Sequence, residues 1–172
     1  MPPLFVFGTL MDPDLLTLVL GRALDPAGVV PARLRGWRRV HVAGRPYPMV
    51  VPHPGGRVEG LLLHGLGPVD LDRLAYYEGW EYRLAPQAVL DAVGRPVAAR
   101  LYRAIGPVRA DPRPWRLDRW RALHKPVALA RLRRLMEAYV PGAGAGGDGR
   151  ARPLFSPGAD RRRRARAAER NG

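Results

Sequence analysis

A short apolar run near the N-terminus sets the strongest limit on the fold. Residues 4–7 are Leu, Phe, Val and Phe and are closed by Gly8, a pattern too short for a helix and typical of a buried strand. Asp12 and Pro13 predict a helix start, because Asp is a favoured N-cap and Pro fits the first helical position. Gly8 to Leu10 is therefore predicted to be a strand-to-helix turn. Successive backbone N–H groups in such a turn can form a concave anion site that suits a carboxylate.

A second stretch, rich in aromatic residues, spans Leu74 to Arg83 and reads Leu-Ala-Tyr-Tyr-Glu-Gly-Trp-Glu-Tyr-Arg. The first part of this stretch belongs to a predicted short helix that begins at Pro68 and Asp70. Gly79 is a suitable residue to end that helix. Glu78 is therefore expected at or just beyond a helix end. Burial among its aromatic neighbours would raise the pKa of the Glu78 carboxyl, because an apolar environment disfavours the charged form.

The rest of the chain up to Tyr102 is predicted to be mostly strands, separated by turns rich in glycine and proline. The predicted strands are 29–34, 37–42, 49–51, 58–64, 82–92 and 95–102. Residues 35–36 separate the first two of these strands, and residues 52–56 form a loop or hairpin turn. Strands in succession with few helices favour an antiparallel, barrel-like α+β domain over alternating βαβ units.

Helical spacing of apolar residues returns at about 115–140, where we predict one helix that is broken or kinked at Pro126. Residues 141–149 are almost wholly Gly, Ala and Pro, which predicts a flexible linker, and the basic run at 161–164 predicts a disordered tail. We therefore expect one domain over 1–140, including the helical segment, followed by a linker and tail over 141–172.

Composition narrows the classes of function. The net charge of +14 would ordinarily suggest a nucleic-acid partner, but among the 29 basic residues only Lys125 is a lysine. Such an arginine-dominated composition indicates a general coding bias, and part of the excess charge lies in the tail at 150–172. We predict no nucleic-acid partner for the domain and at most a weak contact for the tail. Without a signal peptide or a membrane-spanning run, the expected protein is soluble and cytoplasmic, with no membrane partner.

Several kinds of site are excluded by residue type. The absence of cysteine removes disulfides, zinc-thiolate sites and a cysteine nucleophile. The four histidines show no metal-ligand spacing, so we expect no metal site. The sole serine, Ser156, lies in the tail, which argues against a serine-hydrolase triad.

Together, the two stretches described first resemble the gamma-glutamylcyclotransferase superfamily, in particular its AIG2-like branch. The family's opening strand ends in Tyr-Gly-Ser/Thr-Leu, which here reads Phe7-Gly8-Thr9-Leu10. Its later segment is of the type Asp-x-x-Glu-Gly-x-x-Tyr-x-Arg, and residues 77–83, Tyr-Glu-Gly-Trp-Glu-Tyr-Arg, resemble it, with Arg83 directly after Tyr82. Blocks at 21–24, 31–37, 44–48 and 58–62 occur in the family's order, so the resemblance runs from about Leu4 to Tyr102. Phe7 departs from the usual Tyr and lacks its hydroxyl.

The resemblance implies a small mixed or antiparallel β-barrel flanked by helices, and an enzyme that needs neither metal nor cofactor. Its substrate would be a small γ-glutamyl compound that closes on itself, releasing 5-oxoproline and an amine. Glu78 would then be the general acid and base. The substrate would be held at Phe7, Gly8, Thr9 and Leu10, chiefly by backbone N–H groups and the Thr9 hydroxyl. Tyr47 and Tyr82 are candidates by residue type for stabilising the oxyanion.

Alternatives remain at this stage. Glu81 competes locally with Glu78, and Glu59 lies in a predicted strand; either could be a surface group. The same fold could act on another acyl-amine compound or be a non-catalytic small-ligand or partner-binding module, which the missing tyrosine hydroxyl at Phe7 mildly favours. The leaving amine and the oligomeric state stay open, because the loops that would recognise the amine, at 44–56 and 115–139, carry little of the resemblance.

Overall fold

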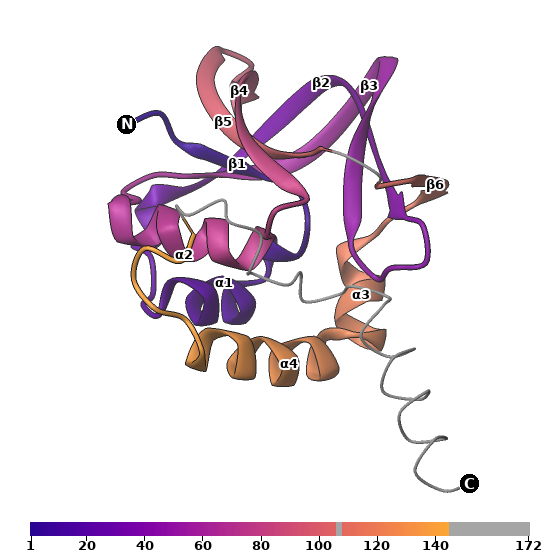
Figure 1. Ribbon diagram of the computed structural model, residues 1–172. Helices are drawn as coiled ribbons and strands as arrows, with labels where there is room; N and C mark the ends of the chain where they lie inside the picture. The colour runs from indigo at the N-terminus through magenta and orange to yellow at the C-terminus, as the bar shows by residue number, and fades with distance from the viewer. Residues whose placement is uncertain (106–107, 145–172) are drawn as a thin grey trace, which may run out of the picture.

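In the computed structural model, which describes residues 1–105 and 108–144, five strands close into a mixed barrel with helices packed on one side (Figure 1). The barrel strands are β1 (Leu4–Val6), β2 (Val29–Val42), β3 (Pro48–Leu63), β4 (Tyr82–Asp91) and β5 (Pro96–Ala104). The helices are α1 (Pro13–Leu20), α2 (Pro68–Glu78), α3 (Leu117–Leu123) and α4 (Lys125–Glu137), with short 3-10 helices η1 (Thr9–Met11) and η2 (Pro26–Gly28). The expectation of a small mixed barrel flanked by helices is confirmed.

The strand order is β3-β1-β5-β4-β2, and a further pairing of β2 with β3 closes the barrel. All of these neighbours are antiparallel except β1 and β5, which run parallel with Leu4 opposite Arg100. A short strand β6 (Ala110–Pro114) pairs with the far end of β2. The central position of β1 between β3 and β5 directs the end of β1, and hence the Gly8 turn, to one end of the barrel.

The predicted division of residues 29–42 into two strands is wrong. They form the single strand β2, with a shift of register between Arg35 and Trp37 and a left-handed backbone at Gly36 (φ 78°). The predicted loop at 52–56 likewise belongs to β3, opposite the same shift. A bulge accommodates the unmatched residues and bends the strand pair without ending it.

Side chains of β1 point alternately into two different apolar cores. Phe5 packs inside the barrel with a cluster that includes Leu34 and Leu101. Leu4 and Val6 belong to the second cluster, which joins the barrel to the helices. Successive side chains of a strand point to opposite faces, so three residues of β1 fix the barrel interior and the helical layer at once.

Helix α1 begins as predicted. The Asp12 carboxylate accepts a hydrogen bond from the Leu15 N–H (3.2 Å) and also from Arg121 Nε (2.7 Å) and Lys125 Nζ (2.9 Å). Burial by itself would raise the Asp12 pKa, but these hydrogen bonds outweigh it and hold the pKa below its usual value. Asp12 thereby ties the start of α1 to α3 and α4.

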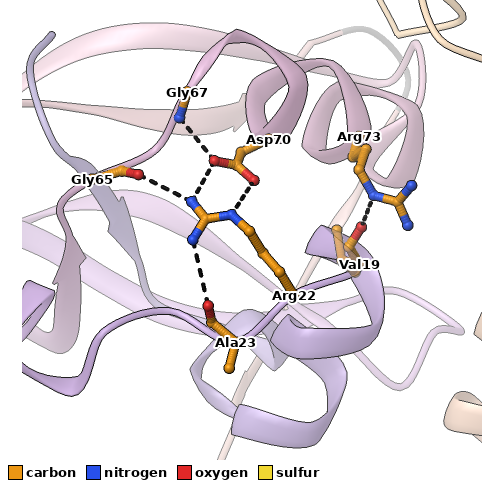
Figure 2. A network of polar contacts seen from close by, with 7 residues as sticks. All are labelled: Val19, Arg22, Ala23, Gly65, Gly67, Asp70 and Arg73. Carbon is orange, nitrogen blue, oxygen red and sulfur yellow. Dashed lines mark hydrogen bonds and ion pairs between the residues drawn. The ribbon is translucent and has the colours of Figure 1, made fainter.

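Helix α2 carries Glu78 at its last position and is anchored at its first turn (Figure 2). Arg22 donates to the Asp70 carboxylate through Nε (3.0 Å) and Nη2 (2.6 Å), and Nη2 also reaches the Gly65 carbonyl (3.0 Å). Asp70 Oδ2, which accepts from Arg22 Nη2, also accepts a hydrogen bond from the Gly67 N–H (2.8 Å). The helix ends at Gly79, as predicted, where φ is 72°. Both ends of α2 are thus fixed.

The predicted helix at 115–140 is two helices, α3 and α4, which meet at His124. Pro126 lies in the first turn of α4, where its missing N–H costs no hydrogen bond. Beyond α4, the Tyr139 hydroxyl (2.5 Å) and the Gly142 N–H (2.7 Å) donate to Asp72 on α2. The linker and tail predicted for 141–172 lie outside the described residues from 145 onward. Among the described helices, none is long and apolar enough to cross a membrane.

Candidate active site

The Gly8 turn and Glu78 line one pocket at the end of the barrel, with a volume of about 70 Å³. Every residue that the sequence assigned to the site lines this pocket: Phe7, Gly8, Thr9, Leu10, Tyr47, Glu78 and Tyr82. They come from the end of β1, the segment before β3, the end of α2 and the start of β4. Residues far apart in sequence therefore face one small volume, as a site for one small molecule requires.

Gly8 is needed for a close approach. A Cβ atom there would lie 2.8 Å from Pro48 Cγ, well inside van der Waals contact. The turn continues into η1, in which Met11 N–H donates to the Gly8 carbonyl (3.0 Å) and Asp12 N–H to the Thr9 carbonyl (3.0 Å). The N–H groups of Gly8, Thr9 and Leu10 donate to no acceptor within residues 1–105 and 108–144. Such unsatisfied N–H groups at a helix start favour an anion.

A hydrogen bond joins the turn to the glutamate-bearing helix. The Thr9 and Tyr77 hydroxyl oxygens lie 2.9 Å apart. Burial raises the pKa of Tyr77, so this phenol stays protonated. The contact holds the Gly8 turn and the last turn of α2 at a fixed separation.

The Glu78 carboxyl group sits in the pocket without a hydrogen bond to any of the described residues. Loss of hydration disfavours its ionised form and raises its pKa from the usual 4.5 to about 8. A carboxyl group with a pKa near neutrality exchanges a proton readily in both directions, which is what a group that serves as base and then acid needs.

The two other candidate glutamates, Glu81 and Glu59, have ionic partners, and of these two only Glu81 also lines the pocket. Glu81 is buried and lies in a two-pronged ion pair with Arg45, at 2.6 Å to Nη1 and 3.1 Å to Nη2. Arg45 Nη1 also donates to the Tyr47 hydroxyl (2.6 Å). Burial raises the pKa of Tyr47 to about 12. Glu59 is exposed on β3 beside Arg33 and Arg57, so it lies away from the pocket.

Sequence reasoning missed several walls of the pocket. Val6 and Tyr77 are immediate neighbours of predicted site residues, and Phe5 lies two positions before Phe7, so closeness in sequence was a usable signal. Tyr102 lines the pocket because β5 pairs in parallel with β1, a long-range pairing that carries no local signal. The role of Arg45 was missed for the same reason. Within the described part of the chain, no three His, Cys, Asp or Glu side chains are grouped to hold a metal ion.

The raised pKa of the half-buried Glu78 carboxyl predicts a pH dependence of stability. Its folded-state pKa of about 8 exceeds its usual 4.5, so Glu78 contributes stability that is fully present below about pH 4.5 and is lost as the pH rises through 8. The glutamine side chain in Glu78→Gln cannot ionise. As the pH rises from 4.5 to 8, the free energy of unfolding of the variant minus that of the wild type should therefore increase by up to about 1.4 kcal/mol per pH unit. Urea unfolding of both proteins across this range measures the gain. A difference that does not change with pH would show that Glu78 is solvated.

Comparisons with known proteins identify the family and support the fold. The family model described as gamma-glutamyl cyclotransferase, AIG2-like, matches residues 4–122. AIG2-like protein A of Arabidopsis thaliana is 32% identical over 148 residues, which cover 84% of this chain and 87% of that protein. The solution structure of an Arabidopsis thaliana protein, 30% identical, covers 81% of this chain and 94% of its own, with a TM-score of 0.56.

A solved structure named gamma-glutamyl cyclotransferase shares the fold, with a TM-score of 0.51 at 17% identity over 81% of this chain and 88% of that chain. The family model covers well over half of the 172 residues and both of its characteristic stretches. The resemblance seen in the sequence is thereby confirmed. This chain belongs to the AIG2-like gamma-glutamyl cyclotransferase family.

Proposed function

We propose that this protein is a γ-glutamylcyclotransferase that acts without a cofactor on a small γ-glutamyl compound. The α-amino nitrogen of the substrate attacks its own δ-carbonyl carbon and forms the C–N bond of a five-membered lactam. The bond from that carbon to the leaving amine then breaks, giving 5-oxoproline and a free amine. The reaction is intramolecular, so the protein needs chiefly to fold the substrate and move protons.

The observation that carries the proposal is that Glu78 and the Gly8 turn line one pocket. The α-amine arrives as an ammonium ion, and the Glu78 carboxylate accepts its proton as the nitrogen attacks. The resulting carboxylic acid then protonates the departing amine, which restores the carboxylate. The restored carboxylate takes the second proton from the ring nitrogen and passes it to the amine, which is released as an ammonium ion. The pKa of about 8 supports both transfers near neutral pH.

The Gly8 turn is assigned to the α-carboxylate of the substrate. The unsatisfied N–H groups of Gly8, Thr9 and Leu10 offer donors to an anion at the start of η1. Binding there leaves the δ-carbonyl free to reach the Glu78 side of the pocket. Phe7 supplies apolar contact only, so this role falls to the backbone and to the Thr9 hydroxyl.

The proposal is tested by incubating the wild-type protein with γ-glutamyl amino acids, γ-glutamyl amines and glutathione and measuring 5-oxoproline and free amine. Release of both in equal amounts from at least one compound is expected, and the preferred compound identifies the leaving amine. If compounds bind but none is converted, the proposal fails, and the non-catalytic binding module becomes the better account of this pocket.

A further inference from the structure

One residue that lines the pocket carries a buried polar atom without a partner among the described residues. The Tyr82 hydroxyl oxygen is buried and has no hydrogen-bond partner among the described residues. A buried hydroxyl left in this state costs free energy in the free protein, because it has given up water without replacement. Tyr82 lines the same pocket as Glu78. An acceptor brought in by a ligand would satisfy it.

We propose that the Tyr82 hydroxyl donates the hydrogen bond that stabilises the oxyanion on the δ-carbonyl during ring closure. The inference rests on the proposed cyclotransferase function and assigns a step which that function leaves open. Tyr82 would contact the reacting atoms directly and would therefore be a catalytic residue.

The backbone holds Tyr82 close to Glu78. Tyr82 is the first residue of β4, and its N–H donates to the carbonyl of Gly79, the residue that ends α2 (3.3 Å). On the other side it pairs with Ala104 in β5. The proton-transfer group and the proposed oxyanion donor thus flank one tight turn whose two ends are fixed by secondary structure.

Two of the other phenol hydroxyls around the pocket are already hydrogen-bonded. The Tyr47 hydroxyl accepts from Arg45 Nη1 (2.6 Å), and the Tyr77 hydroxyl lies 2.9 Å from that of Thr9. Of the phenol oxygens in the described residues, only that of Tyr82 is both buried and unpartnered. Tyr102 also lines the pocket and is the alternative donor that the experiment must separate.

The chemistry is balanced with Tyr82 in this role. As the α-amino nitrogen bonds to the δ-carbon, the carbonyl π electrons move to oxygen, and the Tyr82 O–H donates to that oxygen. Burial raises the Tyr82 pKa, so the phenol keeps its proton throughout. When the bond to the leaving amine breaks, the electrons return to the carbonyl, and the amine takes its proton from Glu78.

Tyr82→Phe removes the hydroxyl alone. For the compound that the wild type converts best, kcat is expected to fall about 10²–10³-fold, the usual effect of losing one oxyanion donor, with KM little changed. The free energy of unfolding is expected to stay the same or rise, because the mutation removes a buried hydroxyl that has no partner. Tyr76→Phe is the matched control, because Tyr76 packs edge-on against Tyr139 and does not line the pocket. The kcat of this variant should equal that of the wild type.

Loss of kcat with unchanged stability in Tyr82→Phe, but not in Tyr102→Phe, supports the inference. A normal kcat in Tyr82→Phe while Glu78→Gln is inactive overturns it and leaves the proposed function intact. The same holds if Tyr102→Phe alone loses activity, or if Tyr82→Phe loses stability and activity in parallel. A wild type that converts no compound removes the proposed function, and this inference with it.

Discussion

Glu78→Gln is expected to lower kcat by about 10²–10⁴-fold, the usual contribution of a positioned general acid or base. The substitution keeps the size of the side chain and removes its titrating group. Because the α-carboxylate of the substrate is assigned to the Gly8 turn and not to Glu78, the affinity for substrate should change little. Steady-state kinetics with the preferred compound, together with calorimetric binding of that compound to the variant, separates the two effects.

Glu59→Gln provides the matched control, because the same chemical change is made at an exposed position on β3 outside the pocket. Its kcat should equal that of the wild type. Equal losses in both variants would point to a general effect of charge. A fully active Glu78→Gln would require another proton-transfer group, and the assignment of Glu78 would be wrong.

Glu81→Ala is expected to lower the free energy of unfolding by about 3–5 kcal/mol, the cost of breaking a buried ion pair by removing one partner. The Arg45 side chain is only 11% exposed and that of Glu81 only 6%, so the guanidinium would be left charged in a nearly dry site. Among the described residues, the Arg45 guanidinium would keep its hydrogen bond to the Tyr47 hydroxyl. Chemical denaturation of wild type and variant measures the loss.

The double variant Arg45→Met with Glu81→Leu tests the cause. Replacing both charges with apolar side chains of similar size removes the uncompensated cation, and stability should return to within about 1 kcal/mol of the wild type. If the double variant is as unstable as Glu81→Ala, packing and not charge burial is the reason for the loss. If Glu81→Ala is itself nearly as stable as the wild type, the pair is better hydrated than its burial indicates.

Local signals were sufficient for the parts of the site that are built from continuous sequence. The strand-turn-helix at residues 4–20 follows from an apolar run, a glycine, an Asp N-cap and a Pro, and it formed as predicted. The same is true of α2, whose first-turn Asp70 and terminal Gly79 define its ends. The family resemblance then connected these two local structures, which composition and periodicity could not do.

Features that depend on strand pairing were not predictable in this way. Glycine and proline in β2 and β3 indicated strand ends, but the two strands pair on both sides of these residues, which form a bulge within continuous strands. The buried partner of Glu81 is Arg45, which lies 36 positions away along the chain. The resemblance pointed to Glu78, and the tertiary structure adds that Glu81 is paired with Arg45, whereas Glu78 has no hydrogen bond to another side chain among the described residues.

The dependence of kcat/KM on pH tests the central claim most directly, because it reports the ionisation of the free protein as it meets substrate. The ionised Glu78 must accept the ammonium proton, so kcat/KM should rise with pH along an acid limb with an apparent pKa of about 8. That limb should keep its position when the leaving amine is changed, because it belongs to the protein. An acid limb near 4.5, the usual pKa of a solvated glutamate, would contradict the account.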